Sequence, residues 1–251
     1  MTSGKKIYFA SDLHLGVKGK TSSAERERLF VDWLESIRDS AEEIHLVGDV
    51  FDFWFEYKKA VPKGFVRTLG KLAEICDAGI SIYMYLGNHD MWLFDYLPQE
   101  IGVEILDGPL IRDFNGKKFY IAHGDGLGPG DHGYKFLKKV FRNKLCQWLF
   151  ARLHPNFGIG LAEYFSKKSR LAESIEEKQF MGEEKEWLII HSKEVASREP
   201  GIDFFIYGHR HLPMELILDS GAKCVNLGDW IVHFTYAEFD GEQLTLKTLH
   251  Q

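Results

Sequence analysis

Five short apolar runs in this chain each end in a cluster of histidine, aspartate or asparagine, and this pattern constrains the fold more than any other feature. The runs are rich in β-branched and aromatic side chains, as strands are. In sheets whose strands alternate with helices, sites form outside the carboxyl ends of the strands. We therefore expect the five clusters to meet at one sheet edge. They are Ser11-Asp12-Leu13-His14, Gly48-Asp49-Val50-Phe51-Asp52, Gly87-Asn88-His89-Asp90, His123-Gly124-Asp125 and Gly208-His209-Arg210-His211.

The spacing of apolar residues predicts an α/β fold. Residues 24–39 and 63–78 carry apolar side chains at helical spacing, and these helices alternate with strands in the first part of the chain. After residue 200 short strands are joined by tight turns, which predicts an antiparallel closing section. The expected strands are 7–15, 43–49, 80–90, 118–125, 203–211, 214–219, 222–230, 234–240 and 243–249.

Composition places the chain among ordinary globular proteins. Of 251 residues, 45% are hydrophobic and 27% are charged, which excludes disordered, collagen-like and coiled-coil classes. The three cysteines are unclustered and odd in number, so neither a disulfide framework nor a cysteine zinc site is expected. Without a targeting segment or an apolar stretch of about 18 residues, we expect a cytoplasmic protein.

Residues 132–200 differ from the rest because they read as wholly helical and are long for a crossover. Residues 132–162 contain six lysines and arginines and no acidic residue; continuing to Arg170 gives a local charge of +8. We expect this segment to be a helical insertion or cap on a core formed by residues 1–131 and 201–251. Its basic helix is either a solvated face or a surface that contacts a membrane.

The side chains of the five clusters suit a metal site. They offer imidazole, carboxylate and one carboxamide but no thiolate, a mixture that favours Mn, Fe, Zn or Co. Residues i and i+2 of a strand share a face, so Asp12 and His14 would be able to bind the same ion. More ligands are present than one tetrahedral site takes, so we expect two ions, and a pair about 3.5–4 Å apart can clamp a phosphoryl group. The candidate ligands are Asp12, His14, Asp49, Asn88, His123, His209 and His211.

In this order and spacing, the five clusters resemble the signature blocks of the calcineurin-like metallophosphoesterases. The resemblance implies a four-layer α/β/β/α sandwich around two divalent ions. It also implies that His89 assists the leaving group or the transferring phosphoryl group, and that Asp52 orients His89. The ligands implied are Asp12, His14 and His211 for the first ion, Asn88, His123 and His209 for the second, and Asp49 as the bridge.

A narrower resemblance is carried by His123-Gly124-Asp125, then Asp131 and Gly133-Tyr134, then the basic insertion. These features are similar to the UDP-2,3-diacylglucosamine pyrophosphatases of lipid A synthesis. The resemblance implies cleavage of this lipid-linked nucleotide sugar at the inner membrane surface and a helical lid over the acyl chains. Among the metals that suit the donor set we expect manganese, with iron, zinc or cobalt as alternatives, and we expect no nucleic-acid partner. The chain departs from the better-studied of those enzymes in having His89 in place of arginine and Asp52 in place of glutamate. The substrate contacts implied are Asn88, His89, Asp131 and His209.

Structural interpretations compete with several of these roles. Asp131 could simply cap the helix that follows it, and Asp90 could be a turn residue. Asp125 more readily holds a ligand histidine in place than binds an ion itself. At the level of function, the alternatives are a soluble nucleotide or nucleotide-sugar phosphodiesterase or phosphatase, and an inactive scaffold of the same fold. A scaffold should have lost ligands, and in this chain the full set is present.

Overall fold

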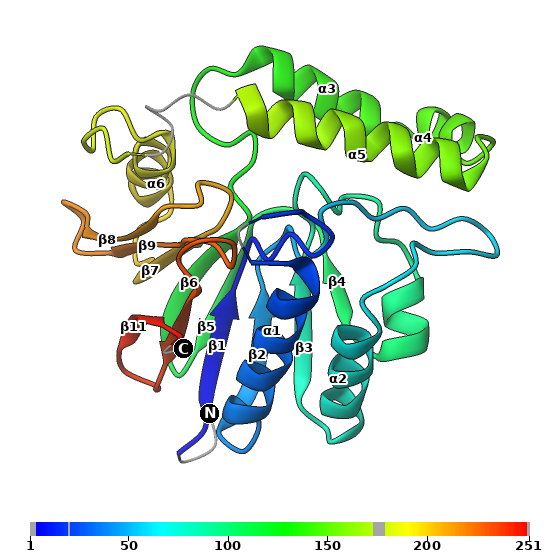
Figure 1. Cartoon of the computed structure of the whole chain (residues 1–251). Helices are drawn as coiled ribbons and strands as arrows, with labels where there is room; N and C mark the ends of the chain where they lie inside the picture. The colour runs from blue at the N-terminus through cyan, green and yellow to red at the C-terminus, as the bar shows by residue number, and fades with distance from the viewer. Residues whose placement is uncertain (1–3, 20, 173–178, 250–251) are drawn as a thin grey trace.

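The computed structural model describes residues 4–19, 21–172 and 179–249, and within them two sheets pack face to face (Figure 1). In spatial order, the first sheet contains β11 (Leu244–Thr248), β10 (Thr235–Phe239), β1 (Lys6–Ala10), β2 (Ala41–Leu46), β3 (Ser81–Tyr85) and β4 (Glu104–Leu106). The second sheet contains, again in spatial order, β5 (Leu110–Phe114), β6 (Lys117–Ala122), β7 (Phe204–Tyr207), β9 (Lys223–Leu227) and β8 (Pro213–Ile217).

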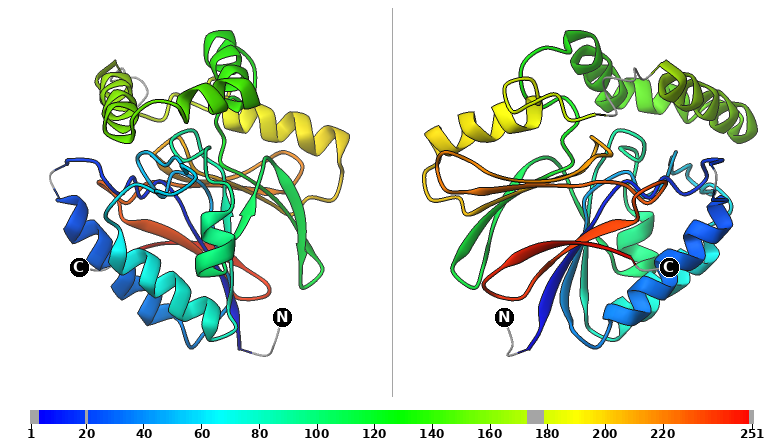
Figure 2. Two further views of the ribbon diagram at one scale, coloured as in Figure 1. Left: turned by 90° about the vertical axis from the view of Figure 1, so that its right-hand side faces the viewer. Right: turned by 60° about the vertical axis from the view of Figure 1, so that its left-hand side comes forward.

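Helices cover the outer faces of both sheets, which confirms the predicted four-layer sandwich (Figure 2). Helices α1 (Ser23–Ile37) and α2 (Val66–Asp77) bury apolar side chains against the first sheet. Helix α6 (Trp187–Arg198) does the same on the second sheet. Phenylalanines of β1, β6 and β7 fill the space between the sheets. A short π-helix, η1 (Leu97–Ile101), precedes β4.

The pairing of the last five strands corrects the predicted antiparallel section. Strand β7 pairs in parallel with β6, because the chain between them crosses over through a helix on the outer face of the sheet. Strand β7 also pairs in parallel with β9. Antiparallel pairing is found between β8 and β9 and between β10 and β11, which lie in different sheets. Strands β4 and β5 were not predicted.

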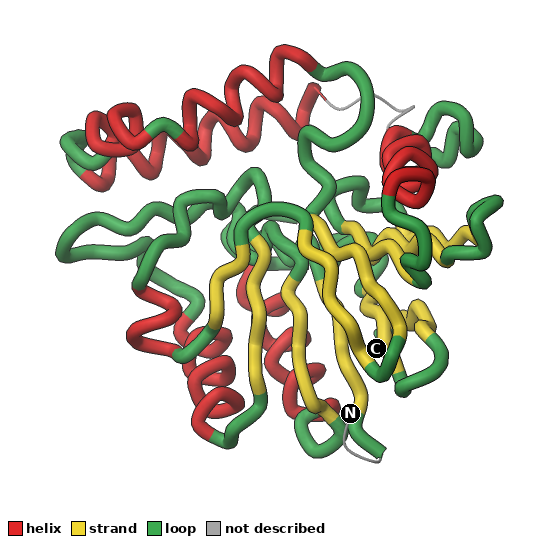
Figure 3. Tube along the Cα trace, turned by 180° about the vertical axis from the view of Figure 1, so that it is seen from behind, coloured by secondary structure: helices red, strands yellow, loops and turns green. Residues whose placement is uncertain are grey.

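Three helices stand apart from the sandwich, above the carboxyl ends of β1, β2 and β3 (Figures 1 and 3). They are α3 (His132–Arg142), α4 (Lys144–Phe150) and α5 (Pro155–Ala172). Asn143 ends α3, and its side chain caps α4 by accepting from the N–H groups of Leu145 and Cys146. No helix in the described part of the chain is long and apolar enough to cross a membrane.

Helix α6 lies inside the range expected to form the insertion, 132–200, but it forms the outer layer of the second sheet. Residues 173–178 of that range lie outside the described residues. We therefore propose that the insertion comprises α3, α4 and α5, with α6 as part of the sandwich.

Candidate metal centre and active site

The ligand candidates lie in loops just beyond the strands, and five of the seven have an unusual backbone conformation. Strand β1 ends at Ala10, so Asp12 and His14 do not share a strand face as expected. Both have a positive φ, 56° and 43°, and so do His209 and His211, at 63° and 53°. Residues with a Cβ rarely adopt this left-handed conformation, and it recurs at functional sites. Loop geometry, not strand alternation, therefore brings these side chains together.

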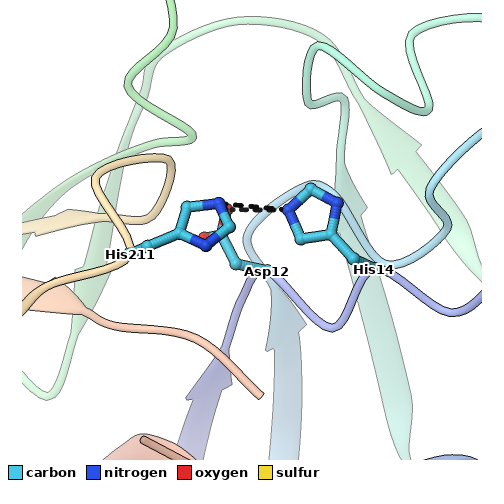
Figure 4. Close-up of side chains that lie close together, drawn as sticks. All are labelled: Asp12, His14 and His211. Atoms are coloured by element: carbon cyan, nitrogen blue, oxygen red, sulfur yellow. Dashed lines mark hydrogen bonds and ion pairs between the residues drawn. The ribbon is translucent and has the colours of Figure 1, made fainter. Parts of the chain in front are cut away.

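Asp12, His14 and His211 form one group of potential metal ligands, shown in Figure 4. The Nε2 atoms of the two histidines are 3.1 Å apart. Asp12 Oδ1 lies 3.3 Å from His211 Nε2 and 3.6 Å from His14 Nε2. This carboxylate oxygen is buried, and among the described residues it has no hydrogen-bond partner. A buried polar atom needs a partner, and a divalent cation would supply one, so the group fits a metal ion.

Asp49, His123 and His209 form a second group with ligand atoms within 4.8 Å of one another. Asp49 Oδ2 lies 3.2 Å from His123 Nε2 and 3.7 Å from His14 Nε2, so it stands between the two groups. Asn88 joins the second group through its Oδ1, 3.1 Å from His123 Nε2. The structure thus brings together all seven residues that the sequence suggested as ligands.

Glycines before the polar residues allow this convergence. A Cβ on Gly87 would lie 2.2 Å from Asp49 Oδ1. A Cβ on Gly208 would lie 2.0 Å from Ser11 Oγ and 2.5 Å from Asp12 Oδ2. Real Cβ atoms do not approach so closely, and therefore the ligand loops can pack this tightly only with glycine at these positions.

Buried opposite charges dominate the electrostatics of the two groups. Burial lowers the pKa of His14, but the carboxylates of Asp12 and Asp52 outweigh it and raise that pKa to about 10. Burial raises the pKa of Asp49, yet the charge of His123 holds it well below its usual value. Burial and the charge of His123 together lower the pKa of His209 to about 4. An entering cation would take the place of protons between these groups, since ligands bind metals in their deprotonated form.

His89 and Asp52, the predicted catalytic pair, are in contact beside the two groups. His89 Nδ1 lies 2.9 Å from the carbonyl oxygen of Asp52 and 3.4 Å from its Oδ1. The backbone N–H of His89 donates to Asp49 Oδ1 at 2.8 Å. His89 also forms a third possible ligand group with His14 and Asp49, so its position suits either a substrate contact or a ligand.

The remaining acidic candidates hold loops and helices in place. Buried Asp90 accepts from the N–H groups of Gly87 and Val50, at 2.9 and 2.8 Å, and so links two ligand loops. Asp125 accepts from Tyr134 Oη at 2.6 Å and pairs with Lys138, which fastens α3 to the loop that carries His123. Asp131 is exposed, and its side chain caps α3 by accepting from the N–H of Tyr134 at 3.2 Å.

Two residues near the site were missed at the sequence level. Asp229 Oδ2 lies 3.4 Å from His211 Nδ1, while its Oδ1 accepts from three backbone N–H groups of the following turn. Its signal was present, since Gly228-Asp229 follows β9 in the same way that Gly48-Asp49 follows β2. Ser166 of α5 carries no such signal, and its Oγ lies 3.2 Å from both Asp52 Oδ1 and His89 Nδ1.

Comparison with known proteins gives concordant matches. The family model described as calcineurin-like phosphoesterase matches residues 5–213. A UDP-2,3-diacylglucosamine hydrolase of Porphyromonas gingivalis is 41% identical over 257 residues, covering 97% of each chain. Proteins with the same name from Histophilus somni and Pseudomonas aeruginosa are 28% and 29% identical, covering 90% and 89% of this chain and 92% and 90% of theirs.

Proposed function

Because this chain belongs to the calcineurin-like phosphoesterase family, we propose that it hydrolyses the pyrophosphate bond of UDP-2,3-diacylglucosamine. The products would be UMP and 2,3-diacylglucosamine 1-phosphate. Relatives of nearly the same length are named as UDP-2,3-diacylglucosamine hydrolases. The observation that carries the proposal is the pair of ligand groups that meet at Asp49, beneath an insertion with exposed apolar side chains.

We assign the ligands to two divalent ions. Asp12, His14 and His211 would hold the first, Asn88, His123 and His209 the second, and Asp49 both. Manganese is the metal we expect, with iron, zinc or cobalt as alternatives for the same donor set. When bound, such a pair activates a water molecule and neutralises charge on phosphoryl oxygens.

His89 is our candidate for the residue that acts on the substrate. Its Nδ1–H would donate to the carbonyl oxygen of Asp52, which fixes the ring and leaves Nε2–H of the imidazolium to donate to a phosphoryl or leaving oxygen. Burial lowers the pKa of His89 in the protein alone, and an anionic pyrophosphate beside the ring would raise it again. Such a donor typically contributes about 10²–10⁴-fold to the rate. We also propose substrate contacts for Asn88, Asp131 and His209.

The insertion supports a lipid-linked substrate. Leu145, Trp148 and Leu149 are 64%, 53% and 54% exposed, so they do not pack against the sandwich. Phe141, another apolar residue of the insertion, is not available in this way, because its ring packs on Trp92. We propose that the exposed residues bind acyl chains and that the enzyme works at the cytoplasmic face of the inner membrane.

Substrate comparison tests this function. Manganese-loaded protein is incubated with UDP-2,3-diacylglucosamine, UDP-N-acetylglucosamine, ADP-ribose, a cyclic nucleotide and nitrophenyl phosphate. We expect release of UMP and a lipid phosphate from the first substrate and little turnover of the others, with chelator-treated protein as the control. Preferred turnover of the water-soluble substrates would contradict the proposal and support the soluble phosphodiesterase alternative.

A further inference from the structure

Arg210 lies between two ligand candidates in the chain, yet its side chain contacts a different part of the molecule. The Arg210 and Glu186 side chains are 4% and 2% exposed. Arg210 Nε lies 3.1 Å from Glu186 Oε2, and its Nη2 lies 3.2 Å from Glu186 Oε1. Nη2 also donates to the carbonyl oxygen of Gln179 at 2.8 Å. A bidentate pair of this kind fixes both distance and orientation, because the planar guanidinium matches the carboxylate.

Glu186 stands where the chain returns from the insertion and enters α6, so the pair joins two regions. The guanidinium of Arg210 lies over the ring of the neighbouring Trp187, 5.5 Å from the ring centroid. The centroids of the Trp187 and His209 rings are 6.4 Å apart. The loop that leads into the insertion reaches the same place, since a Cβ on Gly128 would lie 2.8 Å from the carbonyl oxygen of Trp187. Both ends of the insertion therefore meet beside the loop of His209 and His211.

That loop needs anchors because of its backbone. His209 and His211 are both left-handed, a conformation that persists in residues with a Cβ only when the surroundings hold it. The N–H of His209 donates to Asp12 Oδ2 at 2.8 Å, and Asn226 Nδ2 donates to the carbonyl oxygen of Gly208 at 2.6 Å. The contact of Arg210 with Glu186 holds the same loop to the segment through which the chain returns from the insertion.

We propose that Glu186 and Arg210 form a positioning pair that holds His209 and His211 in the orientation that two metal ions require. His211 belongs to the first ligand group and His209 to the second, so releasing their shared loop should weaken both sites. The inference deepens the proposed function and rests on its metal ligands. It also makes the ligand geometry depend on where the insertion returns to the sandwich.

A double substitution tests positioning apart from folding. Glu186→Gln alone would leave the buried guanidinium without its opposite charge, which destabilises the fold for a reason unrelated to positioning. Glu186→Leu with Arg210→Met removes both charges at similar volume. The matched control is Glu183→Leu with Lys193→Met, a pair at 2.8 Å that also joins the returning segment to α6 but lies at the surface. For each protein, the melting temperature without metal and the number and affinity of bound Mn²⁺ ions are measured.

We expect the Glu186→Leu/Arg210→Met protein to fold and to bind Mn²⁺ at least about tenfold more weakly at both sites, the usual effect of losing a residue that orients a ligand. The control should bind as the wild type does. Two ions bound with wild-type affinity in the folded double variant would overturn the proposal. If that variant fails to fold, Arg210→Lys keeps the charge but loses the bidentate contact, and unchanged affinity in it would overturn the proposal equally. Wild-type protein that binds no divalent ion would contradict the metal centre itself, and this inference with it.

Discussion

Asp49 differs from the other six ligand candidates in facing both groups, at 3.2 Å from His123 Nε2 and 3.7 Å from His14 Nε2. Asp49→Ala should therefore remove both ions. Asn88 contacts the second group, through His123, so Asn88→Ala should weaken the binding of mainly one ion. Metal analysis of the two purified variants after dialysis checks this prediction. Two ions retained in Asp49→Ala would rule out the bridging role.

His89→Ala should keep both ions and lose about 10²–10⁴-fold in kcat, because the side chain is assigned to the phosphoryl group. Metal content and kcat are measured on the same preparation. His89 also lies within ligand distance of His14 and Asp49, so a metal-depleted variant would place it among the ligands instead. His89→Arg is the sharper probe, since arginine can pair with a phosphate oxygen and should keep substantial activity on the lipid pyrophosphate. An inactive His89→Arg protein with full metal content would count against that substrate.

The residues of the candidate site could be selected from the sequence because their chemistry is local. A glycine followed by aspartate, asparagine or histidine at the end of an apolar run is visible in the sequence. Contacts made across the fold are not visible in this way. Ser166 comes to His89 from a helix 77 positions away, and Glu186 to Arg210 from 24 positions away. The left-handed backbone of Asp12 and His14 was also not foreseen, because neither residue type signals it as glycine would.

At the scale of elements, α3 has two kinds of basic residue. Lys138 pairs with Asp125, and Arg142 with Asp107, so these two fasten the helix to the sandwich. Lys139 and, at the start of α4, Lys144 are exposed. Of the basic residues expected to contact a membrane, some therefore hold the helix on the sandwich and only the others are exposed to solvent.

Replacing exposed Lys139 and Lys144 by glutamine should weaken sedimentation with anionic vesicles and leave the melting temperature unchanged. The attraction between exposed charges is screened over about 8–10 Å near physiological ionic strength, so binding should also fall as salt is raised. Lys138→Gln is the comparison variant, because it should loosen α3 from Asp125 and lower the melting temperature. Failure of the wild type to bind vesicles at low salt would leave the basic residues as a solvated face.

Elements with a regular apolar pattern were predicted well, and those defined by distant pairing were not. Helices α1 and α2 begin and end within a few residues of the expected positions. The three-residue strand β4 carries too short a pattern, and it exists because it pairs with β3. Likewise the parallel direction of β7 is decided by the crossover before it and not by its own residues.

At the scale of the whole molecule, the sandwich supplies the loops of the candidate ligands, and the helices of the insertion lie above the sandwich (Figure 1). Helix α5 contributes Ser166 beside the proposed catalytic pair, and Asp125 and Glu186 tie the two ends of the insertion to the loops of the candidate ligands. The sheet core was foreseeable from the sequence, whereas the contacts between insertion and site join residues far apart in the chain. A substrate that contacts the insertion would therefore also affect the loops that we propose to bind the ions.

Acyl chains should for this reason raise kcat/KM strongly. Burying a methylene group gains about 0.8 kcal/mol, and even half of that over several groups amounts to orders of magnitude in affinity, although ordering of the chain offsets part of it. The test compares kcat/KM for UDP-2,3-diacylglucosamine and UDP-N-acetylglucosamine, which share the pyrophosphate but not the chains. Replacing exposed Leu145 and Trp148 by serine should reduce the difference in kcat/KM between the two substrates. Ile217→Ser is the control, because Ile217 is an exposed apolar residue of β8, outside the insertion, and its replacement should leave that difference unchanged. Comparable kcat/KM for the two substrates in the wild type would remove the insertion from substrate selection and place the chain with the soluble nucleotide-sugar hydrolases.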